Sequence, residues 1–208
     1  MIRVITVDRE YGSGGGDIAA KLAERLGWKL WDQQLTDEIA RQMDCDCRAV
    51  EERAERKDSL TYRLFKAFMR GSFEGSLNAP RLKMVDADCI REVTEKTVLQ
   101  AAKTGDSVIV GRGSAYYLRD RADAFHVFVY APLEAKVRRL VEKGETERQA
   151  MEQVEATDRD RAAYIKEYFG VDWPPRYLFN LMINSSMGDE AVVDTILNAV
   201  TLAEKQTA

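Results

Sequence analysis

Short apolar runs alternate with amphipathic stretches along most of the chain. Residues 2–7 carry alternating β-branched side chains and end at Asp8, which predicts a buried first strand. Apolar side chains then recur every four residues over 17–27, a spacing that predicts a helix stopped by Gly27. Residues 28–32 predict a short second strand. A strand, a helix and a strand in this order form a βαβ unit, which implies parallel pairing.

The remaining chain continues the same alternation of strands and helices. Strands are predicted at 107–111, 126–130 and 178–183, and helices at about 85–103, 132–143, 145–168 and around 192–200. Residues 35–69 are helical and charge-rich, and the polar loop 71–80 is predicted to be the most mobile segment. Ser186, three residues before Asp189, predicts a capping box for the last helix. The pattern therefore predicts an α/β fold with a parallel sheet of about five strands.

Composition and charge exclude several classes of protein. Apolar residues make up 45% of the 208 and charged residues 32%, which is typical of one globular domain and not of a disordered chain. No apolar run approaches the ~20 residues of a membrane helix, and the N-terminal stretch lacks the features of a signal peptide. Three cysteines, Cys45, Cys47 and Cys89, indicate free thiols, so we expect a cytoplasmic protein. A net charge of −4 argues against nucleic-acid binding.

Four of the thirteen glycines lie within residues 12–16, directly between the first predicted strand and helix. Consecutive glycines let backbone N–H groups turn toward an anion, and the helix N-terminus adds partial positive charge. The candidate phosphate-binding residues are therefore Gly12, Ser13, Gly14, Gly15 and Gly16. A flexible turn, or a close crossing that lets the helix pack against the sheet, is the alternative interpretation. The strand before the loop and the helix after it favour phosphate binding.

The loop departs from the standard P-loop, G-x-x-x-x-G-K-[ST]. In that motif the lysine neutralises the β- and γ-phosphates, and the hydroxyl helps to hold Mg²⁺. Here Gly15 occupies the lysine position, and Asp17, two residues further on, stands in for the hydroxyl residue, which makes Asp17 the candidate Mg²⁺ ligand. Asp8, Glu10 and Asp17 also surround the loop with negative charge, against Arg9 alone. A bound polyphosphate therefore needs Mg²⁺ or basic residues from elsewhere in the chain.

The sequence resembles the cytidylate kinase-like family, which comprises P-loop proteins related to bacterial cytidylate kinases. The most specific segment is 5–32, where the family has a G-S-G-G loop in place of the ordinary motif. Val108-Ile-Val-Gly-Arg-Gly113 resembles a family strand that ends in Gly-Arg, and Asp158-Arg-Asp-Arg161 resembles the arginine-bearing lid. Residues 180–186 resemble the last strand and turn. The resemblance implies a P-loop NTPase-like single domain over 1–208, with a helical excursion at 36–84 and a lid helix at about 145–170.

The resemblance also implies roles for individual residues. Asp32 and Arg112 match substrate-binding positions, and Arg159 and Arg161 match catalytic lid arginines. The chain departs from the family where Gln33, Gln34 and Glu38 replace the acceptor-binding Ser-Gly and arginine, and where Gly113 replaces an aspartate. From the residues alone, a solvated charged helix remains the alternative for the lid, because Arg159 and Arg161 do not share one helical face. A surface ion pair remains the alternative for Arg112.

Arg9 is the candidate for the cation that the loop lacks. It begins the loop, and its guanidinium can bind two phosphate oxygens at once. The alternative is that Arg9 pairs with Glu10 or Asp17 and steadies the loop. Lys21 lies about one turn into the predicted helix and is expected to be solvated. We therefore predict that Arg9→Ala weakens ATP binding or turnover more than Lys21→Ala; otherwise the charge comes from Arg112, Arg159 or Arg161.

The predicted function is transfer of a phosphoryl group from ATP·Mg²⁺ to a small acceptor, with CMP or another nucleoside monophosphate first in line. Positioning and charge neutralisation carry most such reactions, so no general base is strongly required. One alternative is a nucleotide-binding sensor that lost the lysine and transfers nothing. The other is a kinase that acts on a non-nucleotide small molecule. The predicted partners are a nucleotide and a small acceptor, with no nucleic acid or membrane, and the oligomeric state is left open.

Overall fold

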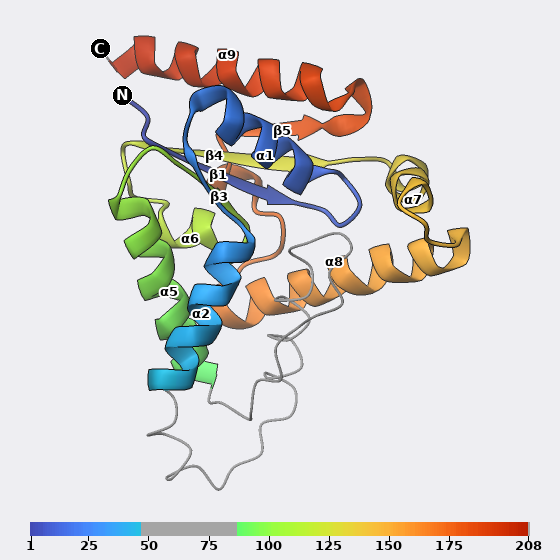
Figure 1. Cartoon of the computed structure of the whole chain (residues 1–208), viewed down its shortest axis with the longest axis horizontal. Helices are drawn as coiled ribbons and strands as arrows, with labels where there is room; N and C mark the ends of the chain where they lie inside the picture. The colour runs from blue at the N-terminus through green and yellow to red at the C-terminus, as the bar shows by residue number, and fades with distance from the viewer. Residues whose placement is uncertain (47–86, 208) are drawn as a thin grey trace, which may run out of the picture.

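A computed structural model describes residues 1–46 and 87–207, which form a parallel five-stranded sheet with helices on both faces (Figure 1). The strands are β1 (Val4–Arg9), β2 (Lys29–Trp31), β3 (Ser107–Val110), β4 (Ala124–Tyr130) and β5 (Leu181–Asn184). The α-helices are α1 (Gly15–Leu26), α2 (Gln33–Asp46), α5 (Ala87–Lys103), α6 (Ser114–Tyr117), α7 (Leu133–Glu142), α8 (Glu147–Phe169) and α9 (Asp189–Thr207). Two 3₁₀ turns, η1 (Arg176–Leu178) and η2 (Ser185–Met187), flank β5. The predicted α/β class is confirmed. The predicted loop 71–80 and most of the predicted excursion at 36–84 lie outside the described residues.

The strand order is β2-β3-β1-β4-β5, and every pair is parallel. Val7 of β1 lies opposite Val110 of β3 and Val127 of β4, so the central strands are in close register. Their carboxyl ends therefore meet at one edge of the sheet. Open α/β sheets bind ligands at this edge, beside the strand where the chain order reverses, which here is β1.

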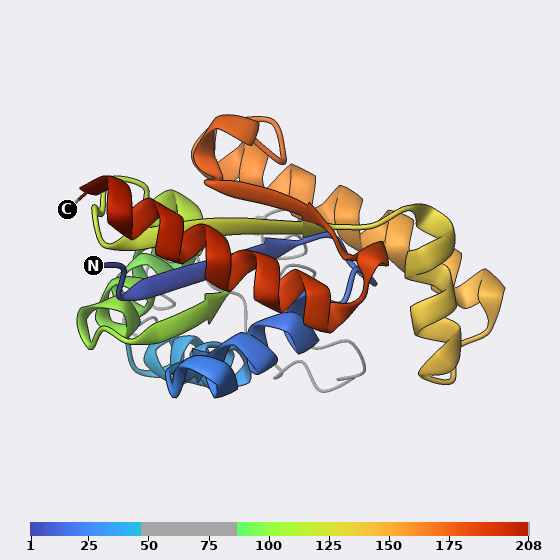
Figure 2. The same cartoon turned by 90° about the horizontal axis from the view of Figure 1, so that it is seen from above.

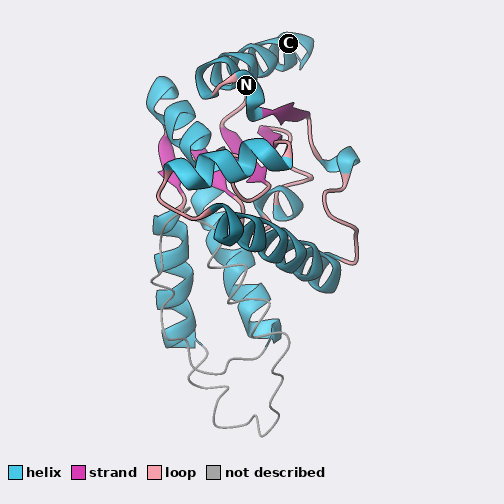
Figure 3. Ribbon diagram, turned by 90° about the vertical axis from the view of Figure 1, so that its right-hand side faces the viewer, coloured by secondary structure: helices cyan, strands magenta, loops and turns pink. Residues whose placement is uncertain are grey.

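Each face of the sheet has its own apolar core. On one face, α1 and α9 lie side by side across the strands (Figure 2), and Ile18, Leu22, Val192 and Ile196 are buried against the sheet. This arrangement follows from the four-residue apolar spacing of both helices. On the other face, α2, α5, α6 and α8 pack around a second cluster that includes Tyr164. Figure 3 shows α2 and α5 extending together away from the sheet.

The helix ends follow local sequence only in part. The helix α1 ends at Gly27, which has a positive φ of 65°, as the sequence predicts. The predicted capping box at Ser186 is wrong, because α9 begins at Asp189 and Ser186 lies in the preceding turn η2. A capping box does occur at α8, where Thr146 accepts a hydrogen bond from the Gln149 amide at 3.3 Å. In the part of the chain that the structure describes, no helix combines the length and apolarity that crossing a membrane requires.

Candidate functional site: a glycine loop between a buried arginine cluster and an open cavity

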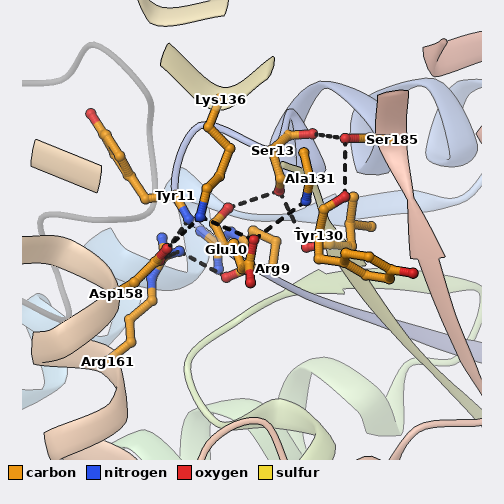
Figure 4. Close-up of polar contacts among 11 residues, drawn as sticks. Arg9, Glu10, Tyr11, Ser13, Tyr130, Ala131, Lys136, Asp158, Arg161 and Ser185 are labelled. Carbon is orange, nitrogen blue, oxygen red and sulfur yellow. Dashed lines mark hydrogen bonds and ion pairs between the residues drawn. The ribbon is translucent and has the colours of Figure 1, made fainter. Parts of the chain in front are cut away.

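The glycine loop joins β1 to α1 at the carboxyl edge of the sheet. Gly12 and Gly14 have positive φ values of 77° and 79°, and Gly14 is the N-cap residue of α1. No side chain caps this helix end, so the first turn of α1 keeps its amides for another partner. The loop is held from behind: Ser13 Oγ donates to the Glu10 carbonyl oxygen at 2.8 Å, and Ser185 Oγ donates to the Ser13 carbonyl oxygen at 2.6 Å (Figure 4). The loop is therefore a fixed structure with an uncapped helix N-terminus.

The glycines of the loop are needed for different reasons. A Cβ atom at position 12 would lie 3.0 Å from Lys136 Cβ, and a Cβ atom at position 15 would lie 2.6 Å from Arg9 Cβ. These two glycines are therefore required by close packing, of Gly12 against α7 and of Gly15 against β1. Gly16 differs from them, because an added Cβ would meet only Asp32 Oδ2, at 3.8 Å, and its φ, like that of Gly15, is not positive. Packing therefore gives no reason for a glycine at position 16, whereas close approach of a ligand to the backbone does.

Three arginines are buried on one side of the loop. Arg9 is 6% exposed, Arg112 2% and Arg161 5%. They come from β1, from the turn after β3 and from α8, and they interact electrostatically with two buried carboxylates, Asp8 and Asp32. This group of five residues, called the arginine cluster below, carries three potential positive charges against two negative ones.

Burial perturbs the ionisation of three members of the arginine cluster. Desolvation, reinforced by the neighbouring Arg9, lowers the pKa of Arg112 from its ordinary value to about 9. Desolvation also raises the pKa of Asp8 and of Asp32 above 3.8, although Arg9 acts in the opposite direction on both. The charges of Arg112, Asp8 and Asp32 are therefore held at a cost, and an anion bound among the guanidinium groups would reduce their mutual repulsion.

The backbone around Arg112 is also unusual. Gly111, Arg112 and Gly113 have consecutive positive φ values of 63°, 58° and 66°. A long side chain rarely adopts this conformation, which costs about 1–3 kcal/mol where it occurs. The conformation directs Arg112 into the arginine cluster at the end of β3. Residues under such strain are concentrated at functional sites, so the geometry favours the predicted binding role of Arg112 over a surface ion pair.

The helix α8 is fastened to the glycine loop through Asp158. Its carboxylate accepts from the Tyr11 amide at 2.7 Å and from Lys136 Nζ at 3.1 Å, and Lys136 Nζ also donates to Glu10 at 3.0 Å (Figure 4). Arg161, one turn further along, donates to the Arg9 carbonyl oxygen at 2.8 Å. Charge-assisted hydrogen bonds thus join the glycine loop to both α7 and α8.

An open cavity of about 880 Å³ lies on the other side of the loop. Its wall is formed by Gly12, by α7, by η2 and by the start of α9. Two cations at its rim are paired: Arg139 Nη2 lies 2.6 Å from Asp189 Oδ1, and Lys21 Nζ lies 2.8 Å from Glu190 Oε1. The Arg139 guanidinium also covers Gly14 directly. The cavity is thus adjacent to the loop, with cations at its rim that already have acidic partners.

The predicted site residues fall into two groups. The loop, Asp32, Arg112, Arg9 and Arg161 gather at one edge of the sheet, although Arg9 runs beneath the loop toward Gly111. Two others lie apart from the buried cluster. Arg159 is exposed because α8 is continuous and residues two apart lie on different faces, and Asp17 is half-exposed and pairs with Lys143 at 3.1 Å.

The sequence pattern does not identify Lys136 or Arg139 as residues of the site. It also does not predict the contact of Asp158 with the loop. Lys136 and Arg139 are one turn apart on α7, in a charged stretch typical of a solvated helix. One feature of the sequence could have identified them. Lys136 and Arg139 follow Pro132 on the first helix after β4, and a helix at that place begins at the edge of the sheet where ligands bind. No cluster of three or more possible metal ligands occurs among the described residues.

Comparisons with known proteins give the family of the chain and structures with a similar fold. A model of the cytidylate kinase-like family matches residues 4–187. Among curated proteins, none matches the sequence. Solved structures with a similar fold include an uncharacterized protein from Eubacterium ventriosum ATCC 27560, at 22% identity and a TM-score of 0.67 over 97% of this chain and 99% of that one.

Two kinases of known name are also similar. Shikimate kinase from Acinetobacter baumannii, in complex with shikimate, has 14% identity and a TM-score of 0.52 over 97% of this chain and 94% of that one. A gluconokinase from Sinorhizobium meliloti 1021 has 13% identity and a TM-score of 0.53 over 99% and 95%. At these identities the similarity shows a shared fold and nothing finer.

Proposed function

The chain belongs to the cytidylate kinase-like family, and from this premise we propose that it transfers a phosphoryl group from ATP to a small anionic acceptor. The observation that carries the proposal is the position of the glycine loop, between a cavity large enough for a nucleotide and a buried cluster with more guanidinium than carboxylate groups. A phosphotransferase needs two anionic partners on opposite sides of one phosphate cradle, and this arrangement offers both.

The donor nucleotide would lie on the cavity side. Its base and ribose would occupy the cavity beside α7 and η2, and its phosphates would meet the amides at the start of α1, near Gly14 and Gly16. Arg139 at the rim would be available to the phosphates if it exchanged its carboxylate partner for a phosphate oxygen. These positions agree with the phosphate-binding roles predicted for the loop.

The acceptor would lie on the side of the arginine cluster. Arg112 and Arg161 would bind its anionic group, and Asp32 would orient it at the end of β2. The phosphate of CMP would complement the positive charge of these guanidinium groups, and so would a carboxylate. Guanidinium groups would also neutralise the charge of the transferring phosphoryl group in a site from which water is excluded.

The site residues fit Mg²⁺ that arrives with the nucleotide. Such an ion is held mainly by phosphate oxygens and one or two carboxylates, and it neutralises charge on the phosphates. Asp17 remains the predicted Mg²⁺ ligand, and its ion pair with Lys143 would have to break before it could bind the ion. Asp32 is a second acid near the loop, 3.8 Å from the side-chain position of residue 16.

Coupled measurement of ADP release tests the proposal. The parent protein is supplied with ATP·Mg²⁺ and, in separate reactions, with CMP, UMP, AMP, shikimate or gluconate, and ATP binding is followed by calorimetry. We expect turnover with at least one acceptor, CMP first. Gly14→Val is the control, because a β-branched residue is strained at a φ of 79° and its side chain would meet Arg139. ATP binding by the parent without turnover on any acceptor would favour the nucleotide-sensor alternative, and no ATP binding would overturn the proposal.

A further inference from the structure

We propose that Arg9 supplies the positive charge that the lysine supplies to the phosphates in a standard P-loop. This inference rests on the proposed function. It explains two departures from the standard motif at once, the glycine at position 15 and the arginine at position 9. The two positions are six residues apart in the sequence, but they compete for the same space.

The geometry shows this competition directly. A Cβ atom at position 15 would lie 2.6 Å from Arg9 Cβ, 2.8 Å from Cγ and 3.5 Å from Cδ. The Arg9 side chain therefore fills the path on which a side chain at position 15 would begin. The Cβ atom of Arg9 is fixed by the backbone and cannot move away, so Arg9 and a lysine at position 15 exclude each other.

The head of Arg9 lies where a phosphate-binding cation is useful. From beneath Gly15 the side chain runs to the end of β3, where its Nη1 atom fills the space beside Gly111. The guanidinium is thus among Asp8, Asp32 and Arg112 at the carboxyl edge of the sheet. Arg9 is thus the member of the arginine cluster that contacts the loop, which places it between the proposed donor and the proposed acceptor.

The burial of the site explains the choice of arginine. Arg9 is 6% exposed, and an ammonium group buried to that degree loses its proton readily, whereas a guanidinium keeps its charge. Arginine also reaches further than lysine and can bind two oxygens of one phosphate. Its carboxylate neighbours hold the head in place before a ligand binds.

The inference predicts that the two positions can be exchanged. Gly15 is the first residue of α1 and does not have a positive φ, so its backbone accepts a lysine once the Arg9 side chain is removed. Gly15→Lys alone should lower the melting temperature, because Arg9 still occupies the path. Arg9→Gly alone should leave the loop without its cation. The double variant Arg9→Gly/Gly15→Lys restores the standard arrangement.

The experiment compares five proteins: the parent, the two single variants, Arg9→Gly/Gly15→Lys and Arg9→Gly/Gly15→Met. The methionine variant is the matched control, because it fills the same path without a charge. ATP·Mg²⁺ and AMP are titrated into each protein by calorimetry, and melting temperatures are recorded. Loss of one charge-assisted contact should weaken ATP binding by Arg9→Gly roughly ten- to a hundredfold. AMP lacks the β- and γ-phosphates, so its binding should change little.

Recovery of ATP affinity in the lysine double variant, and not in the methionine one, would support the inference. Equal ATP affinity in the two double variants would overturn it and leave Arg9 a purely packing role, as would parent-like ATP binding by Arg9→Gly. If the parent itself binds no ATP, the proposed function falls and this inference falls with it. If the parent binds and turns over ATP while the exchange fails, only the inference falls.

Discussion

The two sides of the glycine loop are built from similar residues in opposite ways. The arginine cluster is almost closed to solvent, and Arg112 is desolvated and lies in a backbone segment with three successive positive φ values. The cavity side carries Arg139, whose pair with Asp189 is partly buried, and Lys21 and Lys143, whose side chains are 38% and 36% exposed and lie in ion pairs at an open surface. The exposed pairs of the two lysines contribute about 0–1 kcal/mol each.

Under the proposed function, this difference corresponds to two modes of binding. The arginine cluster is formed before any ligand arrives and is held at a cost in stability, as expected of a preorganised site for a small anion. The cavity side can exchange its carboxylate partners for phosphate at little cost. A rigid site suits selection of the acceptor, and an adaptable one suits a nucleotide that enters and leaves in each cycle.

The largest effect should come from Arg112→Met. Loss of this guanidinium should reduce turnover by about a hundredfold or more, since it removes a preorganised donor from a site closed to water. The unfolding free energy should fall by less than the ~3–5 kcal/mol expected when one partner of a buried ion pair is removed, because the cluster holds one more guanidinium than carboxylate and Arg9 and Arg161 remain beside Asp32. Thermal melts and ADP-release rates measure the two effects. The Arg148 side chain is 83% exposed, so Arg148→Met is the control and should change neither the melting temperature nor the rate of ADP release. An Arg112→Met protein with normal turnover would contradict the comparison.

The next largest effect should separate two arginines of α8. Arg161→Ala removes a buried side chain that donates to the Arg9 carbonyl oxygen, and a charged hydrogen bond of this kind contributes about 1.5–3 kcal/mol. Arg159→Ala changes an exposed residue, and such substitutions stay within about 0.5 kcal/mol. Turnover should fall strongly only in the first variant. Equal loss in both would show that α8 changes its conformation when the ligand binds.

A smaller effect is expected where α7 meets the loop. Lys136→Met leaves Glu10 and Asp158 without the ammonium between them, and the two carboxylates are only 26% and 18% exposed. We expect a loss of about 1–3 kcal/mol in urea unfolding, less than for a fully buried pair. Lys143→Met removes the exposed pair with Asp17 and should cost about 0–1 kcal/mol. Similar losses from the two variants would remove the distinction between a buried and an open side.

The smallest effect is a dependence on pH. Burial raises the pKa of Asp32 above 3.8, so the folded state binds this proton more tightly than the unfolded state. The contribution of Asp32 to stability is therefore greatest at low pH and falls as pH rises from about 4 through the raised pKa. Asp32→Asn has no such proton. Its melting temperature relative to the parent should rise as pH increases over this range, and a constant difference would show that Asp32 titrates normally.

The sequence predicts the sheet and the loop because both depend on short-range patterns. The buried strands are apolar runs, and Gly12 to Gly16 stand between a strand and a helix with a clear four-residue apolar spacing. The contacts of Lys136 and Asp158 could not be predicted in this way. They join residues far apart in the chain, and their charged helices resemble solvated ones. The reason for Gly15 is not visible in the pattern either, since it is the path of the Arg9 side chain beneath the loop. A glycine motif therefore shows where a loop lies, and only packing shows which of its glycines a ligand requires.

The central claim, that the donor nucleotide binds on the cavity side of the loop, is tested most directly by filling the cavity. Ala135 of α7 lines it, half-buried, so Ala135→Trp should occupy the space without disturbing the arginine cluster. Calorimetric titration with ATP·Mg²⁺ compares this variant with the parent. The account predicts a loss of ATP affinity of at least about tenfold at an unchanged melting temperature, equivalent to about 1.4 kcal/mol of binding free energy. Parent-like ATP affinity in Ala135→Trp would contradict it and place the nucleotide elsewhere.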